Sequence, residues 1–167
     1  MHKPWIALTA ALLLASPGVY AAGIGKGDFE AGLSISISQT EIDIEGFGTT
    51  DSDTGIIELS GGYFFSDQLQ FLLSLSEVIS SDFTYGTLAP GVDWMFVTGG
   101  STVVPFAGAA FALGLQDNPT DYLEVHGGVK YFFREDTSVE ARLSYASPTD
   151  SAFDAYTDLT VGINIYF

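Results

Sequence analysis

Ionisable side chains recur at alternate positions in the second half of the chain, where their spacing could support chemistry. The even-numbered positions here include Glu124, His126 and Lys130, and further along the chain Glu140 and Arg142. Alternate residues of a β-strand point to the same face, so this spacing would gather carboxylates and cations on one side of a sheet. A cluster of this kind can form ion pairs, line a conduit or supply a general base.

A catalytic role for these residues lacks a nucleophile. The chain has no cysteine and only two histidines, of which one is His2 near the start. A nucleophile needs a base within hydrogen-bonding reach, but His126 is followed by two glycines instead of a serine. The same count excludes a zinc site built on histidine or cysteine. We therefore expect no enzymatic activity and no cofactor.

The composition narrows the class of protein. The 167 residues suit one domain, and they are 47% hydrophobic, 14% aromatic and only 16% charged. Lys and Arg total 5 against 21 Asp and Glu, a formal net charge of −16. The aromatic content argues against disorder. The acidic balance argues against binding to nucleic-acid phosphates, because that needs clustered Lys and Arg.

The first 21 residues have the pattern of a secretory signal peptide. Lys3 precedes an apolar run from Trp5 to Ala15, and Pro17 and Gly18 end the run. Val19-Tyr20-Ala21 then offers small or tolerated residues at the cleavage positions. A permanent membrane anchor is the alternative, but the run is shorter than the roughly 20 residues of a membrane-spanning helix. We predict cleavage after Ala21, with Ala22 as the near alternative, and one exported domain over 22–167.

Apolar residues then recur with a period of two. At the end of the chain, Leu159, Val161, Ile163, Ile165 and Phe167 alternate with polar or small residues. Similar patterns predict strands over 27–39, 54–65, 68–79, 86–97, 103–115, 121–133, 137–146 and 156–167. The Gly- and Ala-rich segment 103–115 leaves its own phase open. These lengths are close to the roughly 9–11 residues of a tilted strand that crosses a bilayer.

The connections between these strands alternate in length. Tight turns are expected at 66–68, 98–102 and 134–136, and longer polar loops at 40–53, 80–85, 116–120 and 147–155. The run Tyr63-Phe64-Phe65 precedes the first tight turn, and Tyr131-Phe132-Phe133 precedes the last. This repeat indicates similar turns at one membrane interface. Short turns at one end and longer loops at the other are typical of outer-membrane barrels.

The two faces of the strands separate a membrane barrel from a soluble one. In a soluble sandwich or lipocalin-like barrel, the polar face would be the outer surface and usually rich in Lys and Glu. Here that face is mostly Ser, Gly, Ala and Thr. The apolar face carries aromatic residues at strand ends, as an interfacial girdle would. These residues are Tyr63, Phe65, Phe71, Trp94, Phe96, Phe106, Tyr131, Phe133 and Phe167. We predict an all-β fold, an eight-stranded antiparallel transmembrane β-barrel with short periplasmic turns and longer extracellular loops.

Three motifs resemble those of a known family. They are the Gly-Tyr-Phe-Phe-Ser-Asp run at 62–67, the Pro-Phe-Ala-Gly-Ala run at 105–109, and the alternating strand that ends on Phe167. Together they resemble the small bacterial outer-membrane β-barrels of the OmpA/OmpX/OmpW-like type. This resemblance implies a C-terminal insertion signal formed by Val161, Ile163, Ile165 and Phe167. It also implies the outer membrane as location, with membrane lipid, lipopolysaccharide and the barrel assembly machinery as partners. Lipid A deacylases are similar in size, but their His-x-Ser pair is not matched at His126.

Two sets of residues remain as candidate functional sites. The strand phases place a polar and charged network in the barrel lumen: Glu30, Glu58, Asp93, Glu124, His126, Lys130, Glu140, Arg142 and Asp158. The first long loop is acidic and is a weak candidate for divalent-cation binding: Glu41, Asp43, Glu45, Asp51 and Asp53. Asp51-Ser52-Asp53 lacks the Gly and Glu of a calcium loop. Two functions stay open: a role in envelope integrity or surface interaction through the loops, or a narrow channel for small ions or small hydrophobic solutes.

Overall fold

The computed structural model describes residues 24–44, 48–79, 84–96, 101–115 and 120–167. These residues form eight strands and no helix. Among them, no helix is long and apolar enough to cross a membrane. The strands are β1 (Phe29–Ile44), β2 (Gly48–Phe64), β3 (Leu69–Ile79), β4 (Thr84–Met95), β5 (Val103–Leu115), β6 (Tyr122–Arg134), β7 (Thr137–Pro148) and β8 (Tyr156–Tyr166).

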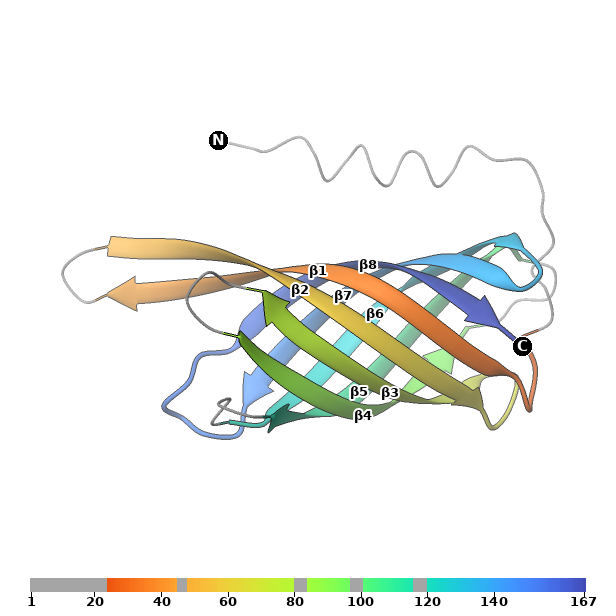
Figure 1. The fold of residues 1–167 in the computed structure, drawn as a ribbon, viewed down its shortest axis with the longest axis horizontal. Coiled ribbons are helices and arrows are strands. Elements are labelled where there is room, and N and C mark those ends of the chain that lie inside the picture. The colour runs from red at the N-terminus through yellow and green to blue at the C-terminus, as the bar shows by residue number, and fades with distance from the viewer. Residues whose placement is uncertain (1–23, 45–47, 80–83, 97–100, 116–119) are drawn as a thin grey trace.

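The eight strands close into an antiparallel barrel in which each strand pairs with its neighbours in the chain (Figure 1). The seam between the first and last strands runs from Glu30 opposite Tyr166 to Gln39 opposite Thr157. Past the end of β8, the Phe29 amide donates to the Phe167 carbonyl and the Phe167 amide donates to the Phe29 carbonyl. Closure leaves no unpaired strand edge along the wall, which a bilayer requires. The predicted fold class is confirmed.

The hairpin formed by β1 and β2 is longer than predicted. Residues 40–53 were expected to be a loop, but β1 continues to Ile44 and β2 begins at Gly48. Because β1 pairs with β8 only as far as Gln39 and β2 pairs with β3 only from Gly55, the paired ends of β1 and β2 extend beyond both neighbouring strands (Figure 1). Thr and Ile favour extended backbone, and outside a membrane both faces of a strand can be polar. The polar composition therefore resembled that of a loop.

The turn between β6 and β7 is tighter than predicted. Only Glu135 and Asp136 separate the two strands, and the register shifts between Phe132 and Arg134. The extra residue in β6 is a bulge, which replaces the third residue of the expected turn. The Thr137 hydroxyl donates to the Asp136 carboxylate at 2.9 Å, and this hydrogen bond lowers the pKa of that carboxyl.

The apolar residues of the strands face outward. The exposed large hydrophobic side chains include Leu33, Ile35 and Ile37 on β1 and Leu159, Val161 and Ile163 on β8. Buried positions alternate with them and are largely polar. This is the reverse of a soluble barrel and the arrangement of a transmembrane one, in which the outer band meets lipid.

The phase of β5, which the sequence left open, places even-numbered residues inside. Val104, Phe106, Ala110 and Ala112 are buried, whereas Phe111 is exposed on the outer surface. The expectation that Phe106 belongs to the outer aromatic girdle is therefore wrong. Its strand carries apolar side chains on both faces, so alternation alone could not show which face points inward.

Candidate functional site

The barrel interior is where the structure places all nine residues of the predicted lumen network. They come from β1, β2, β4, β6, β7 and β8. The inward-pointing residues are odd-numbered in β4 and even-numbered in the other five strands. Seven of them are buried as whole residues: Glu30, Asp93, His126, Lys130, Glu140, Arg142 and Asp158. The side chains of Glu58 and Glu124 are 13% and 16% exposed. Charges at this depth need partners, and carboxylates of the network supply them to His126, Lys130 and Arg142.

One group, here called the lysine cluster, consists of three of these residues, Glu30, Lys130 and Glu140, together with Asn164. The Lys130 ammonium lies 2.6 Å from the Glu30 carboxylate and 3.3 Å from the Glu140 carboxylate. The Asn164 amide donates to Glu140 at 3.0 Å. Lys130 is only 1% exposed. The ammonium is thus held between carboxylates from β1 and β7, on either side of the seam strand β8.

The lysine cluster continues into an arginine cluster of Ser34, Glu58 and Arg142. The Arg142 guanidinium donates to the Glu58 carboxylate at 2.7 Å, and the Ser34 hydroxyl donates to the same oxygen at 3.3 Å. A second guanidinium nitrogen lies 3.8 Å from Glu140. Glu140 therefore links the two cations. The resulting chain of charges runs from Glu30 on β1 to Lys130 on β6, continues through Glu140 and Arg142 on β7, and returns to Glu58 on β2. It fills an interior that is narrow in any eight-stranded barrel.

A third group, the histidine bridge, joins Asp93, His126 and Glu124. The His126 Nε2 lies 2.7 Å from Asp93 and Nδ1 lies 2.9 Å from Glu124. An ionised carboxylate only accepts hydrogen bonds, so this geometry suits an imidazolium that donates from both nitrogens. Neither ring nitrogen is left for a metal ion or for a nucleophile. Among the described residues, no group of three or more His, Asp or Glu could hold a metal ion.

A glycine makes room for the histidine bridge. A Cβ at Gly108, on the neighbouring β5, would overlap the Asp93 carboxylate oxygen, and it would lie 2.5 Å from the His126 Nε2. Real Cβ atoms do not approach other atoms so closely, so a larger residue here would push the bridge apart. The glycine of the Pro-Phe-Ala-Gly-Ala run thus leaves the space in which Asp93 and His126 meet.

Two buried features were not predicted. Gln70 on β3 is fully buried, and neither its amide nitrogen nor its oxygen has a hydrogen-bond partner in the described part of the chain. At the same end of the barrel, Ile24 lies among six side chains that we call the apolar ring: Phe64, Met95, Val104, Phe106, Phe132 and Tyr166. The repeated Tyr-Phe-Phe run was a signal for two of these, Phe64 and Phe132. The glycine-rich segment around Ile24 has no periodic pattern, so nothing indicated its position.

The two other predicted sites lie on the outside of the barrel. Glu41, Asp43, Asp51 and Asp53 belong to the projecting part of the β1–β2 hairpin, while Glu45 lies outside the described residues. Val161, Ile163 and Ile165 form the exposed face of β8, and Phe167 follows it, 72% exposed. The predicted signal peptide, 1–21, lies outside the described residues.

Comparisons with known proteins identify solved structures of similar fold. No protein-family model matches the chain, and no curated protein sequence does. The N-terminal β-barrel domain of Pseudomonas aeruginosa OprF is similar with a TM-score of 0.67 at 16% identity, over 86% of this chain and 99% of that one. Neisserial surface protein A has a TM-score of 0.65 at 18% identity, over 85% and 100% of the two chains. Ail of Yersinia pestis has a TM-score of 0.57 at 14% identity, over 85% and 99%.

The matches cover nearly the whole of each similar chain, so the resemblance extends to the complete barrel. The turn end of this barrel, where Phe29 at the start of β1 meets the C-terminal Phe167, corresponds to the periplasmic end of such proteins. The end with the projecting hairpin corresponds to the extracellular one. The chain has the fold of the small eight-stranded outer-membrane β-barrels.

Proposed function

We propose that this protein is a non-catalytic outer-membrane barrel that contributes to envelope integrity or surface interaction through its acidic extracellular segments. The observation that carries the proposal is the β1–β2 hairpin, which extends beyond the strands on both sides of it. Its backbone positions include Glu41, Asp43, Asp51 and Asp53. The barrel then serves as the anchor and the hairpin as the contact surface.

A non-catalytic role is supported by the state of the one histidine in the exported domain. Both ring nitrogens of His126 lie within 2.9 Å of carboxylates, so neither is left to activate a serine or a water molecule. A general base must reach the proton that it removes. The ion-paired groups around His126 instead support a structural core that stabilises the barrel from inside.

The charge of the extracellular side favours cationic partners. Ail has been determined in complex with the heparin analogue sucrose octasulfate, a polyanion. The acidic hairpin of this chain would repel such a ligand. Divalent cations that bridge carboxylates to lipopolysaccharide phosphates, or a basic protein surface, fit it better.

The test compares three versions of the full-length gene in a Gram-negative strain that lacks it. One is unchanged, and one has residues 41–53 replaced by an Asn-Gly turn. In the third, Glu41, Asp43, Glu45, Asp51 and Asp53 are changed to the matching amides. Entry of a hydrophobic dye into cells reports envelope integrity, with and without a chelator of divalent cations. We expect both variants to fold but to admit dye faster, and the chelator to reproduce that effect. Unchanged dye entry in both folded variants would contradict the proposal.

A narrow cation-preferring channel is the second candidate. It is favoured by the lumen network, in which five carboxylates surround three basic side chains. An excess of fixed negative charge selects cations. Single-channel recording of the purified protein in a planar bilayer separates the two candidates. Steady cation-selective openings would favour the channel, whereas a folded and silent barrel would favour the extracellular role.

A further inference from the structure

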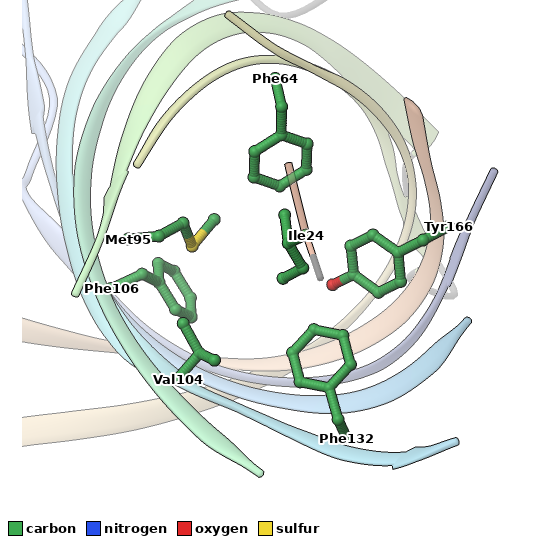
Figure 2. Packing of buried hydrophobic residues seen from close by; sticks show 7 residues of the cluster. All are labelled: Ile24, Phe64, Met95, Val104, Phe106, Phe132 and Tyr166. Atoms are coloured by element: carbon green, nitrogen blue, oxygen red, sulfur yellow. The ribbon is translucent and has the colours of Figure 1, made fainter. Parts of the chain in front are cut away.

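We propose that the segment from Ile24 to Asp28 is a plug that seals the periplasmic mouth of the barrel. Figure 2 shows Ile24 in the middle of the apolar ring, surrounded by its six side chains. Those side chains come from β2, β4, β5, β6 and β8, so they reach in from most of the wall. Ile24 is 8% exposed, and no ring residue is more exposed than that. The plug is independent of any function of the extracellular hairpin.

The segment is shaped to turn Ile24 back into the barrel. The Asp28 amide donates to the Gly25 carbonyl at 3.1 Å, and the Gly25 amide donates to the Asp28 carboxylate at 2.8 Å. Gly27 has a φ of 104°, in the left-handed region where a side chain would be strained. These features define a tight reversal of the chain immediately before β1.

Three further hydrogen bonds join this reversal to the end of β2 and to the β2–β3 turn. The Gly27 amide donates to the Phe64 carbonyl at 2.9 Å, and the Phe64 amide donates to the Asp28 carbonyl at 3.0 Å. These two bonds continue the pairing of β1 with β2. The Lys26 amide donates to the Asp67 carboxylate at 3.0 Å, at an exposed position. The Lys26 bond is separate from the barrel wall, so Ile24 and Lys26 can detach without disturbing any strand pairing.

The ring closes the space around Ile24 with aromatic contacts. The Tyr166 ring lies 5.1 Å from that of Phe132 and 6.4 Å from that of Phe64, measured between centroids. On the other side of this layer, the Lys130 ammonium lies 5.5 Å from the centroid of Phe106. The charged lumen is therefore separated from the periplasmic mouth by an apolar layer. Water and ions cross such constrictions poorly because they gain no polar partner there.

The plug is tethered on one side only. If the signal peptide is cleaved after Ala21, two residues precede Ile24 in the exported chain. Release of Ile24 would then move a short free end, not a loop fixed at both ends. The inferred device is a removable N-terminal stopper, and any passage through the lumen would require its release.

The absence of cysteine from the chain allows a direct test by thiol labelling. Ser138 is fully buried beside the ring, where its hydroxyl lies 3.1 Å from the Tyr166 hydroxyl. A Ser138→Cys variant, expressed from the full-length sequence and purified in detergent, is treated with a small charged methanethiosulfonate. We expect the thiol to react slowly, and about tenfold faster or more once Ile24→Gly is added, because the plug shields it.

Two controls isolate the effect of the plug. Ser36→Cys places a thiol next to Thr160, two residues further along β1 than Ser34 of the arginine cluster. The charged network thus lies between this thiol and the plug, so its labelling rate should not depend on Ile24. Lys26→Ala changes a side chain but keeps the backbone hydrogen bond, so it should leave labelling at position 138 unchanged. Heat-modifiable migration on gels confirms that each variant is folded.

A second variant keeps the test decisive if Ile24→Gly does not fold. Asp67→Ala removes the exposed acceptor of the Lys26 amide and should accelerate labelling at position 138 to a smaller extent. Equal labelling rates at position 138 with and without Ile24, or with and without the Asp67 carboxylate where Ile24→Gly does not fold, would overturn the proposal. In that case access to position 138 would not depend on the plug, whether or not the apolar ring restricts it.

Discussion

At the scale of single residues, small side chains determine where the charged groups of the lumen can lie. Gly108→Ala should destabilise the barrel by about 1–3 kcal/mol, because the added methyl overlaps Asp93 and crowds His126. Gly61→Ala is the matched control, since its Cβ would meet only the Glu30 carbonyl oxygen at 3.9 Å. Urea unfolding in lipid vesicles, followed by the fluorescence of Trp94, measures both. Trp94 is the one tryptophan outside the predicted signal peptide. Equal midpoints for the two variants would contradict the expected clash.

The lysine cluster allows a second prediction at this scale, by a double-mutant cycle. Lys130→Met should cost about 3–5 kcal/mol, because it leaves Glu30 and Glu140 buried without their cation. Glu30→Gln in the same chain removes one of those charges. The double variant should therefore lose less stability than the sum of the two single variants, by about 1 kcal/mol or more. Additive losses would show that the 2.6 Å contact contributes little.

The buried amide of Gln70 leads to the opposite expectation. Its nitrogen and oxygen have no partner among the described residues, and the side chain is fully buried. An amide in this state costs free energy that an apolar side chain of similar shape would not. Gln70→Met should raise the free energy of unfolding by about 1–3 kcal/mol in the same urea assay. A loss of stability would mean that the amide makes hydrogen bonds in the membrane-embedded protein.

At the scale of elements, the sequence predicted every strand, because a barrel wall between lipid and a polar lumen demands strict alternation. The prediction was incomplete where the alternation of polar and apolar residues is weak. Beyond the membrane, the β1–β2 hairpin needs no apolar face, so its strands resembled a loop. In β5, the residues from Val103 to Ala112 are apolar or small on both faces, so the alternation could not show which face points into the lumen. The ion-pair partners in the lumen could not be predicted from the sequence either. The alternation of β6 predicts that Lys130 points inward, but only the register between β1 and β8 brings it to Glu30.

The end of β8 is the element whose loss should affect assembly most. Deleting Phe167 removes two backbone hydrogen bonds with Phe29 at the seam, together with an exposed aromatic side chain. We expect less folded barrel in the outer membrane of cells. Phe65→Ala is the control, since Phe65 is also an exposed aromatic at the turn end but lies away from the seam. Folded barrel is quantified by its heat-modifiable migration. Equal amounts for the two variants would remove any special role of the terminal residue.

At the scale of the whole molecule, the apolar layer and the ion-paired network are two barriers in series between the periplasm and the cell surface. Arg142 is the cation that connects Glu58 to Glu140, so Arg142→Ala should open the network but leave the plug in place. Ile24→Gly should open the plug but leave the network in place. Each single variant should therefore remain silent in a planar bilayer.

The double variant Ile24→Gly/Arg142→Ala should conduct, with a preference for cations, because the carboxylates of Glu58 and Glu140 then face the lumen without that guanidinium. The measurement is single-channel current in asymmetric salt, whose reversal potential gives the ion preference. Conduction by Arg142→Ala alone would mean that Ile24 does not close the mouth. A folded but silent double variant would mean that the remaining side chains fill the lumen. The barrel would then act only as a membrane anchor, and the function would lie in the extracellular hairpin.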